Sequence, residues 1–308
     1  MHDSLLILVA ATAVATATPL LLAALGETVI ESAGVLNLGV EGMMLIAALT
    51  AFWGSTSFGN PWYGIIAAAL VTAGAGAVYA CVTVTLGCDQ VVAGLALNIL
   101  AAGLTSYLGR ALVGVPPSEI LKPVALPGLA DIPVLGLIFF QQPIMAYLAF
   151  LCVPALAFFM FGTRWGLNLR AVGESPSTAD AAGISVVAYR YFATVAGAGI
   201  IGLAGAHLST SIAPAWTDNL TGGRGWIALA LVIFGGWNPV KVLVGALLFG
   251  VVEALSYHAQ ALNLPISSYF LQATPYLFTV IVLGLSARYS QRRRLGAPAA
   301  LGLFWQRV

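Results

Sequence analysis

Long uncharged runs of apolar residues dominate the pattern along the chain. A membrane-spanning helix needs about 20 mostly apolar residues, and six runs are long enough to cross a bilayer without help from neighbours. They are residues 4–25, 62–86, 90–109, 143–162, 191–212 and 269–287. The pattern therefore predicts a chain built from transmembrane helices.

Three further apolar runs are weaker. Residues 42–58 are short, residues 225–240 are short and contain two glycines and a proline, and residues 242–260 contain Glu253. Short segments interrupted by glycine or proline are typical of broken helices in transporters. We therefore predict an all-α integral membrane protein with about nine transmembrane helices (range about 8–10), some of them broken, and an internal repeat. The first run has no basic residue before it and exceeds a usual signal-peptide core, so we expect it to be retained.

Composition narrows the class further. Of the 308 residues, 60% are apolar and 7% are charged, whereas about 25% are charged in a soluble domain. The net charge of +1 gives no basic excess for phosphates, so no nucleic-acid partner is expected. The histidines share no spacing with carboxylates, and neither a metal nor a cofactor is predicted. Cys81, Cys88 and Cys152 lie in apolar runs without CxxC spacing and are predicted to be small buried hydrophobic residues.

The basic residues predict how the chain is oriented. Short cytoplasmic loops hold an excess of Lys and Arg. In the nine-span arrangement, we expect the N-terminus outside and the C-terminus in the cytoplasm. Residues 1–290 then form one transmembrane domain, and residues 291–308 form a basic cytoplasmic tail that attracts anionic membrane lipid. The outer side receives Arg110, Lys122 and Arg224, and the inner side receives Arg164, Arg170, Arg190, Lys241, Arg288, Arg292, Arg293, Arg294 and Arg307.

Two nucleotide-binding patterns do not predict a nucleotide site in this chain. No GxxxxGK[ST] sequence is present, so any ATP must be handled by another chain. Residues 197–202 satisfy GxGxxG, but they lie inside an apolar run with no strand before them. We interpret them as small residues that allow close helix packing. The order of residues suggests no Ser/His/Asp arrangement, and no catalytic residue is predicted.

Three polar segments carry a resemblance to a known family. Residues 26–44 read GETVIESAGVLNLGVEGMM, residues 163–176 read TRWGLNLRAVGESP, and residues 222–239 include GGRGWIALA and IFGGWNP. Together they resemble the inner-membrane permease subunits of ABC importers for simple sugars and nucleosides, within the branched-chain amino acid permease superfamily. The resemblance extends over roughly residues 5–290.

The resemblance implies a transport subunit without bond chemistry, located in the bacterial inner membrane. Its implied partners are a paralogous permease subunit forming a heterodimer, an ABC ATPase subunit that hydrolyses ATP, and an extracytoplasmic substrate-binding lipoprotein. Nucleosides are the first expected substrate class, simple sugars the second and branched-chain amino acids the third. A different reading is a self-contained secondary transporter driven by an ion gradient, in which carboxylates bind the ion. Those carboxylates are Glu27, Glu31, Glu41 and Glu253.

Residues 163–190 are predicted to be the cytoplasmic coupling loop. Ser175 is a candidate cap, Pro176 suits the first helical turn, and Gly183 suits the end of a short helix. A short helix between spans has a shape that fits a groove of a soluble partner. The resemblance implies that this loop docks the ATPase through Arg170, Gly173, Glu174, Pro176, Ala181, Ala182 and Gly183.

Polar side chains within the spans are candidates for the substrate pathway. An amide or carboxylate does not tolerate hydrocarbon, so these groups face the bundle or a pathway. Asn37, Glu41, Asn98 and Trp226 are the candidate pathway residues. Asn98 is equally compatible with a role in joining helices, and Glu253 is predicted to form a buried structural hydrogen bond. We further hypothesise that the interrupted segments 34–42 and 222–239 approach one another across the bundle.

The outer loops give two smaller expectations. Trp216 and Trp226 flank residues 213–225 and are predicted to lie at the membrane interface. Residues 111–141 contain five prolines and form the longest outer loop. That loop either receives a binding protein or covers the end of the bundle.

Overall fold

The computed structural model describes residues 2–262, 267, 270–271, 273–281, 284 and 297–306, with side chains described from residue 5 onward. Helices make up most of this part, and the predicted all-α membrane architecture is confirmed. The helices are α1 (His2–Ser32), α2 (Val40–Phe58), α3 (Pro61–Ala80), α4 (Gln90–Gly109), α5 (Leu135–Phe139), α6 (Ile144–Gly162), α7 (Arg164–Glu174), α8 (Pro176–Ala181), α9 (Val186–His207), α10 (Arg224–Gly235) and α11 (Pro239–Ala261).

The predicted number of nine spans is not confirmed. Six segments within the described residues are long and apolar enough to cross a membrane, namely 5–32, 61–85, 90–112, 144–162, 186–212 and 239–261. The predicted span 225–240 is divided because α10 ends at Gly235 and α11 begins at Pro239. With 12 residues, α10 is about 18 Å long, too short for a hydrocarbon core of about 30 Å. The predicted span 269–287 lies partly outside the described residues.

The helix α9 is the centre of the bundle and packs against α1, α2 and α3. Its small residues make this possible. A Cβ atom on Gly197 would meet Ile30 and the Gly26 carbonyl of α1, and one on Gly205 would meet the Met44 carbonyl of α2. The GxGxxG sequence is therefore a helix-packing surface, as predicted.

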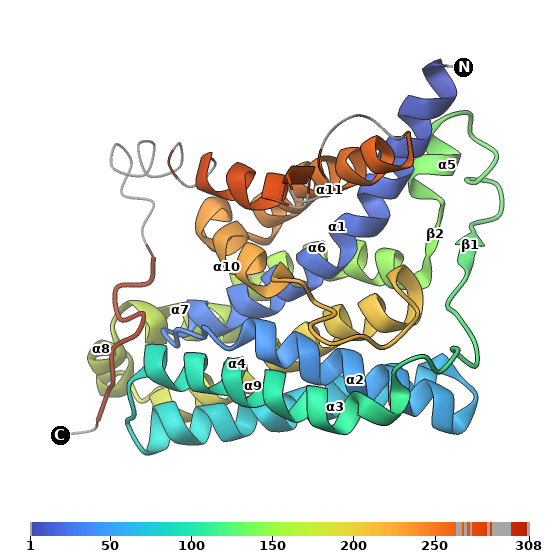
Figure 1. The fold of residues 1–308 in the computed structure, drawn as a ribbon. Helices are drawn as coiled ribbons and strands as arrows, with labels where there is room; N and C mark the ends of the chain where they lie inside the picture. The colour runs from blue at the N-terminus through green and yellow to red at the C-terminus, as the bar shows by residue number, and fades with distance from the viewer. Residues whose placement is uncertain are drawn as a thin grey trace.

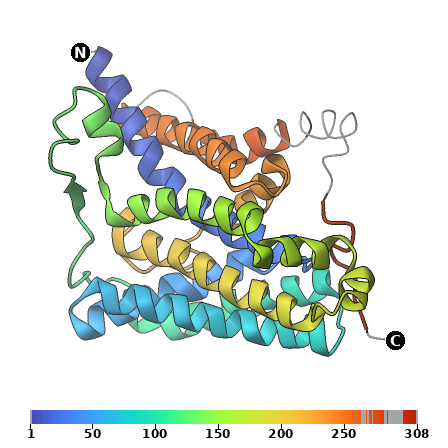
Figure 2. The same cartoon turned by 180° about the vertical axis from the view of Figure 1, so that it is seen from behind.

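The bundle has two distinct ends, which Figures 1 and 2 show from opposite sides. The N-terminus lies at the end that carries α5 and the antiparallel strands β1 (Pro123–Ala125) and β2 (Gln141–Pro143). Strand β1 and helix α5 lie within the proline-rich loop 111–141, and strand β2 begins at the end of this loop. Helices α7 and α8 lie at the other end, together with residues 297–306. The two terminal regions of the described chain are thus at opposite ends of the bundle.

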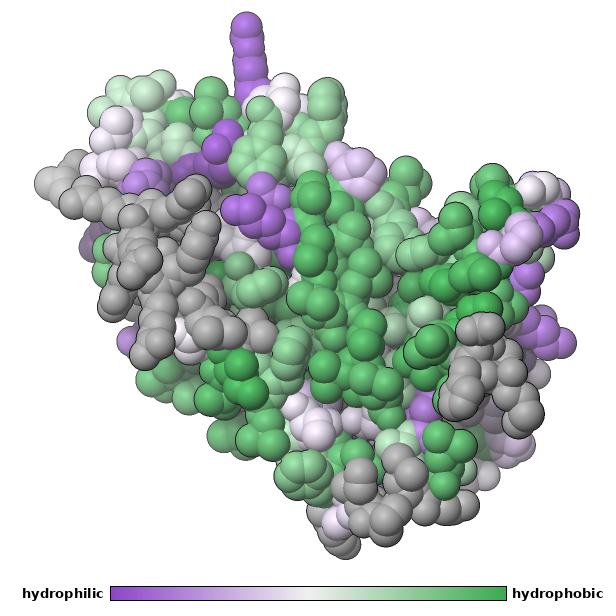
Figure 3. All heavy atoms as spheres, turned by 90° about the horizontal axis from the view of Figure 1, so that it is seen from above, coloured by the Kyte–Doolittle hydropathy of each residue, from purple (hydrophilic) through white to green (hydrophobic). Residues whose placement is uncertain are grey.

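The outer surface of the bundle is apolar. Figure 3 shows one such face, where green side chains cover much of the surface around α11. Exposed large apolar residues on α11 are Val240, Val244, Leu248, Val251 and Leu255. An apolar outer surface suits contact with lipid or with another membrane protein.

Two predictions about individual residues are wrong. Cys81 and Cys88 are exposed and Cys152 is half-buried. A side chain on the outer surface of a membrane helix, as at Cys81 and Cys152, can be apolar without being covered by protein, and Cys88 lies in the loop before α4. Trp216 is only 1% exposed and packs with Ala48, Leu49 and Phe52. It lies inside the bundle because the loop that carries it folds back over α2 and α4, where a Cβ atom on Gly109 would collide with the indole ring.

Candidate functional site

The turn between α1 and α2, residues 33–39, is irregular backbone inside the bundle. Its polar groups are satisfied by side chains from α3 and α4. The Leu36 amide donates to Gln90 Oε1 at 2.6 Å, and the Tyr79 hydroxyl donates to the Leu36 carbonyl at 2.7 Å. Non-helical backbone at membrane depth persists only where neighbouring groups provide such partners. This turn is therefore an interruption that the surrounding helices support.

Asn37 and Asn98 both stabilise this turn. Asn37 donates to Glu27 Oε2 at 2.9 Å and accepts from the Gly39 amide at 3.0 Å. Asn98 donates to the Leu38 carbonyl at 2.7 Å and accepts from the Gly42 amide at 2.7 Å. The structure brings these two predicted residues to the same turn, Asn37 fully buried and Asn98 half-buried. Their amides satisfy backbone groups that the interruption leaves without helical partners.

Glu41 connects α2 to the beginning of α10. Its carboxylate accepts hydrogen bonds from the Thr221 hydroxyl at 2.5 Å, the Gly223 amide at 2.7 Å and the Gly225 amide at 2.6 Å. A carboxylate at a helix N-terminus satisfies free amide groups and interacts favourably with the helix dipole. The interrupted segments 34–42 and 222–239 therefore meet at Glu41, as we hypothesised from the sequence.

The close contact at Glu41 depends on glycine. Gly223 has a φ of +81°, a conformation that favours glycine. A Cβ atom on Gly225 would lie 2.5 Å from the Glu41 amide nitrogen, so a larger residue would separate the two segments. Trp226, the next residue, is 40% exposed on the surface of α10.

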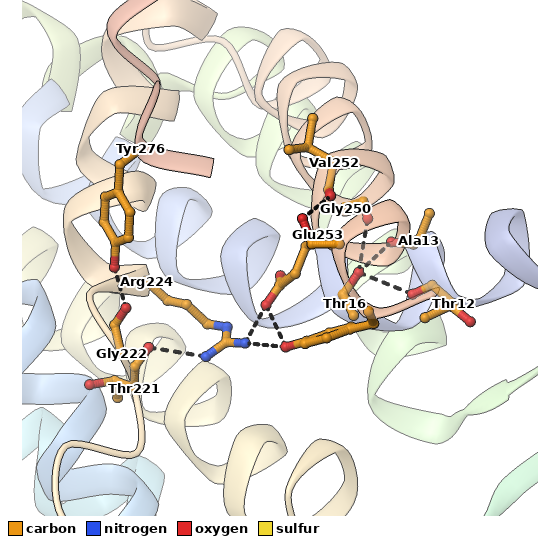
Figure 4. A network of polar contacts seen from close by, with 12 residues as sticks. Thr12, Ala13, Thr16, Thr221, Gly222, Arg224, Gly250, Val252, Glu253 and Tyr276 are labelled. Carbon is orange, nitrogen blue, oxygen red and sulfur yellow. Dashed lines mark hydrogen bonds and ion pairs between the residues drawn. The ribbon is translucent and has the colours of Figure 1, made fainter. Parts of the chain in front are cut away.

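Arg224 and Glu253 form an ion pair between α10 and α11 (Figure 4). Arg224 Nη2 also bonds the Tyr257 hydroxyl at 2.9 Å, and its Nη1 donates to the Thr221 carbonyl at 3.2 Å. The Tyr257 hydroxyl in turn donates to Glu253 Oε1 at 2.9 Å. Glu253 thus accepts a structural hydrogen bond, as predicted. It also forms an ion pair with a cation, the guanidinium of Arg224.

This ion pair leads to a prediction about stability. The side chains of Arg224 and Glu253 are 16% and 13% exposed, so removal of one leaves a largely buried charge. We expect Glu253→Ala to destabilise the protein by about 3–5 kcal/mol. The double variant Arg224→Met, Glu253→Leu should be substantially more stable than Glu253→Ala because it leaves no unpaired charge. The free energy of unfolding in detergent measures the stability of each variant. If the double variant loses as much stability as Arg224→Met and Glu253→Leu lose together when made singly, the two side chains do not interact and the prediction is contradicted.

The segment predicted to dock an ATPase forms two helices, α7 and α8, where a single short helix was expected. The Thr163 hydroxyl caps α7 by accepting from the Gly166 amide at 3.0 Å. Arg170 on α7 donates to the Met160 carbonyl at 3.1 Å and lies over the Phe161 ring at 4.9 Å. Arg170 therefore holds α7 against the end of α6.

Helix α8 begins with Pro176, as predicted, but its capping differs from the prediction. Ser175 occupies the cap position without bonding a backbone amide, because its hydroxyl pairs with the Thr178 hydroxyl at 2.7 Å. Pro176 is buried, whereas Ala181, Ala182 and Gly183 are exposed. The buried start of α8 thus supports an exposed end made of small residues.

Residues 297–306 pack onto this region, which sequence reasoning missed. The Ala300 amide donates to the Gly173 carbonyl at 2.9 Å, and the Gly302 amide donates to the Gly34 carbonyl at 3.3 Å. Arg190 Nη1 donates to the Leu303 carbonyl at 3.0 Å. A weaker bond joins the Ala299 amide to Glu174 Oε2 at 3.4 Å. We call residues 297–306 the terminal strap, because they connect α7, α9 and the α1–α2 turn.

Sequence reasoning missed other partners as well. It used Arg224 only to orient the chain. Arg224 follows two glycines, and Glu253 is the single glutamate in its apolar run. Each charge alone is costly in a membrane, which favours an ion pair between the two. It also missed Trp237, whose Nε1 donates to Glu31 Oε2 at 2.6 Å. The Trp-Asn-Pro sequence after two glycines is the signal that marks the end of α10.

A family comparison agrees with these features. Residues 9–285 match the family described as branched-chain amino acid transport system, permease component. The chain belongs to this family of membrane permeases. It is therefore a transport subunit and not an enzyme. No solved structure matches it.

Relatives with transporter names extend over nearly the whole chain. A putative glucose ABC transporter permease protein of Haloferax volcanii, TsgC13, is 39% identical over 94% of both chains. The guanosine ABC transporter permease protein NupQ of Bacillus subtilis is 36% identical, over 93% of this chain and 94% of its own. The nucleoside ABC transporter permease protein NupC of Lactococcus lactis is 35% identical, over 87% and 88%.

Bacillus subtilis has a second guanosine ABC transporter permease protein, NupP. It is 26% identical to this chain, over 91% of this chain and 81% of NupP. Two permease chains named for guanosine in one organism are thus related to this chain.

Proposed function

We propose that the chain is a transmembrane permease subunit of an ATP-driven ABC importer that translocates nucleosides or simple sugars. The names of its relatives support this substrate class. The structural observation that most directly supports the proposal is that Glu41 joins two interrupted helical segments inside an otherwise apolar bundle. Interrupted helices that meet inside the membrane are where transporters place their substrate sites.

The proposed pathway runs beside these two segments. Asn37, Glu41 and Asn98 shape its wall by holding the turns in place, and Trp226 faces it from α10. This assignment is supported by the hydrogen bonds of the three polar side chains. A pathway of this kind opens to each side in turn, because ATP binding and hydrolysis stabilise the two states differently.

We propose that α7 and α8 dock the ATPase. Ala181, Ala182 and Gly183 are exposed and small, so a groove can receive them closely. Gly173 and Glu174 contact the terminal strap, while Arg170 and Pro176 fix the two helices on the bundle. These contacts connect the proposed docking surface to the α1–α2 turn through the strap.

The proposed partners are a paralogous permease subunit, an ABC ATPase and an extracytoplasmic binding lipoprotein. The two Bacillus subtilis guanosine permeases support a heterodimer. The exposed apolar faces of the helices suit a second permease and membrane lipid. We place the chain in the bacterial inner membrane, with the N-terminus outside, the C-terminus in the cytoplasm and a basic tail at residues 291–308.

Uptake measurements test the proposed function. Proteoliposomes that contain both permeases and the ATPase, with the lipoprotein supplied, should accumulate labelled adenosine, uridine or glucose only when ATP is provided. Imposed ion gradients should have no effect without ATP. The carboxylates of Glu27, Glu31, Glu41 and Glu253 all accept hydrogen bonds from protein groups, which supports structural roles for them. Uptake that follows a gradient without the ATPase would contradict the proposal.

Labelling of single cysteines tests the orientation. Ser118 is exposed near β1 and Ser177 is exposed on α8, at the opposite end of the bundle (Figure 1). In a cysteine-free background, Ser118→Cys should react with a membrane-impermeant thiol reagent in intact cells, and Ser177→Cys should react only after the membrane is opened. The reverse pattern would invert the orientation, and labelling of both in intact cells would refute the topology.

A further inference from the structure

A groove on the outer surface of the bundle lies between α3 and α4, with α2 as its floor. Helix α2 packs closely against both α3 and α4, whereas α3 and α4 touch each other only slightly. The three helices lie side by side in Figure 1. The groove has a volume of about 470 Å³, which is within the usual range of about 300–1,000 Å³ for small-molecule sites.

The groove opens towards the membrane. Val71 on α3 and Leu104 and Leu108 on α4 line it, and all three are exposed on the outer surface of the bundle. They lie within the segments 61–85 and 90–112, which are long and apolar enough to cross a membrane. In a bilayer, hydrocarbon therefore surrounds these side chains, and an occupant of the groove reaches it from the membrane.

The interior of the groove suits hydrocarbon. Thr50 and Thr105 are the hydroxyl-bearing side chains of its lining. Each hydroxyl hydrogen is already used within the chain, because Thr50 donates to the Ile46 carbonyl and Thr105 donates to the Ala101 carbonyl, both at 2.7 Å. A polar ligand would lose hydrogen bonds to water without gaining equivalent ones from these hydroxyls. A hydrocarbon chain has no such bonds to lose.

The size of the groove argues against a helix of another protein as its occupant. A helix with its side chains is about 10–12 Å across. The 470 Å³ of the groove would hold only about 4–6 Å of such a helix, which is roughly one turn. An acyl chain is much thinner and can lie along the groove between α3 and α4. The shape therefore favours a lipid chain.

One end of the groove carries a free cation. The segment 90–112 ends in a short 3₁₀ helix, Arg110–Leu112, whose last two residues line the groove. Arg110 is exposed and forms no ion pair with any residue that the structure describes. An arginine at the end of a span extends towards the level of the lipid headgroups. A guanidinium can bind a phosphate through two N–H groups.

Trp53 supports the same orientation of a lipid. It lines the groove from α2 and is 62% exposed. Tryptophan is enriched where hydrocarbon meets the headgroups. Beyond Arg110 the chain leads to β1, at the end of the bundle that holds the N-terminus (Figure 1). The groove thus combines an apolar channel at membrane depth with a cation at the membrane boundary.

We propose that this groove binds one anionic phospholipid, with an acyl chain between α3 and α4 and the phosphate at Arg110. Charge complementarity selects an anionic headgroup, because a zwitterionic headgroup carries its own cation, which competes with Arg110 for the phosphate. The bound lipid covers Val71, Leu104 and Leu108 and connects α4 to α3. This site is separate from the proposed pathway and does not rest on the import function.

Lipid binding to the purified full-length chain tests the headgroup. Native mass spectrometry measures the binding of dioleoyl phosphatidylglycerol and of dioleoyl phosphatidylcholine. The wild type should bind one molecule of phosphatidylglycerol more tightly than phosphatidylcholine. Arg110→Gln should weaken the binding of phosphatidylglycerol roughly fivefold, as expected for one basic residue near an anionic lipid. Equal affinity for the two lipids, unchanged in Arg110→Gln, would overturn the anionic assignment.

A second variant tests the groove itself. Leu104→Trp places a larger side chain in the groove and should weaken the binding of phosphatidylglycerol more than about 10-fold, as expected when two or more methylene groups are no longer buried. Leu100→Trp is the matched control, because Leu100 is exposed on α4 outside the groove, and it should bind lipid as the wild type does. If Leu104→Trp does not fold, Val71→Trp fills the groove from the opposite wall.

Two outcomes would overturn the lipid site. The first is equal binding of phosphatidylglycerol by the wild type and by a folded variant with a filled groove. The second concerns Leu104→Cys in a cysteine-free background. If this thiol is cross-linked efficiently to another protein chain in native membranes, a protein covers the groove in place of a lipid. The proposal predicts that it is not cross-linked.

Discussion

Replacing Ala181 with arginine is expected to abolish uptake while the protein remains inserted and folded. Ala181 is exposed at the end of α8, so the larger side chain has room in the isolated chain. In the proposed complex it would place an unpaired charge in a groove shaped for alanine, at a cost of about 3–5 kcal/mol. This corresponds to a loss of docking affinity of more than about 100-fold. Co-purification of the ATPase and uptake in cells measure the effect.

The matched control is Glu119→Arg. Glu119 is exposed in the loop before β1, and β1 lies at the end of the bundle opposite to α8 (Figure 1). This variant therefore adds a charge of the same kind away from α8 and should transport normally. Gly183→Trp should also abolish docking, but Gly183 has a φ of +81° and tryptophan there adds backbone strain. Normal ATPase association and uptake in Ala181→Arg would refute the docking role of α8.

Replacing Glu41 with alanine should have the second large effect. The carboxylate accepts three hydrogen bonds from Thr221, Gly223 and Gly225, and hydrogen bonds to charged groups contribute about 1.5–3 kcal/mol each. We expect a loss of at least about 3 kcal/mol for the contact between α2 and α10. Uptake should fall to background and the midpoint of thermal unfolding in detergent should drop. Uptake and thermal stability of Glu41→Gln should lie between those of the wild type and Glu41→Ala. The glutamine oxygen can still accept a hydrogen bond, but its NH2 group is a donor and would face backbone N–H groups, which are also donors.

Leu8→Ala is the comparison for Glu41→Ala. Leu8 is 51% exposed on the outer surface of α1, so its truncation removes apolar contact without opening the bundle. The loss of uptake in Asn37→Ala should lie between the losses in Glu41→Ala and Leu8→Ala, because this variant removes one hydrogen bond to Glu27 and one from the Gly39 amide. Equal uptake in Glu41→Ala and Leu8→Ala would show that the α2–α10 contact does not matter for transport.

The contact at Glu41 could be predicted from the sequence because both of its partners carry local signals. A carboxylate at the beginning of an apolar run and a Gly-Gly pair before another run each mark an interrupted helix. Transporters bring such interruptions together. Asn98 was recognised as an inward residue for a similar reason, since hydrocarbon does not tolerate an amide.

Other parts of the site depend on how helices cross, and the sequence does not contain that information locally. Arg224 and Glu253 are brought together by the turn at Gly235 and Gly236, which ends α10 inside the run 225–240 that was predicted as a single interrupted span. Trp216 has the composition of an interfacial residue, yet it is buried because Gly109 makes room for its ring. Contacts between residues far apart in the sequence therefore determine both the Arg224–Glu253 ion pair and the burial of Trp216.

The position of the terminal strap has a consequence for the order of assembly during synthesis. Trp305 packs with Val172, Ala179 and Val186 around α7 and α8, so the proposed docking surface contains residues that are translated far apart. A ribosome that adds about 5–20 residues per second needs roughly 7–26 s to travel from Gly173 to Trp305. A nascent chain therefore exposes α7 and α8 before the strap exists, and the complete surface forms only after the helices up to α11 have been made. In the proposed complex, the ATPase therefore meets a complete docking surface only after the membrane bundle has been synthesised.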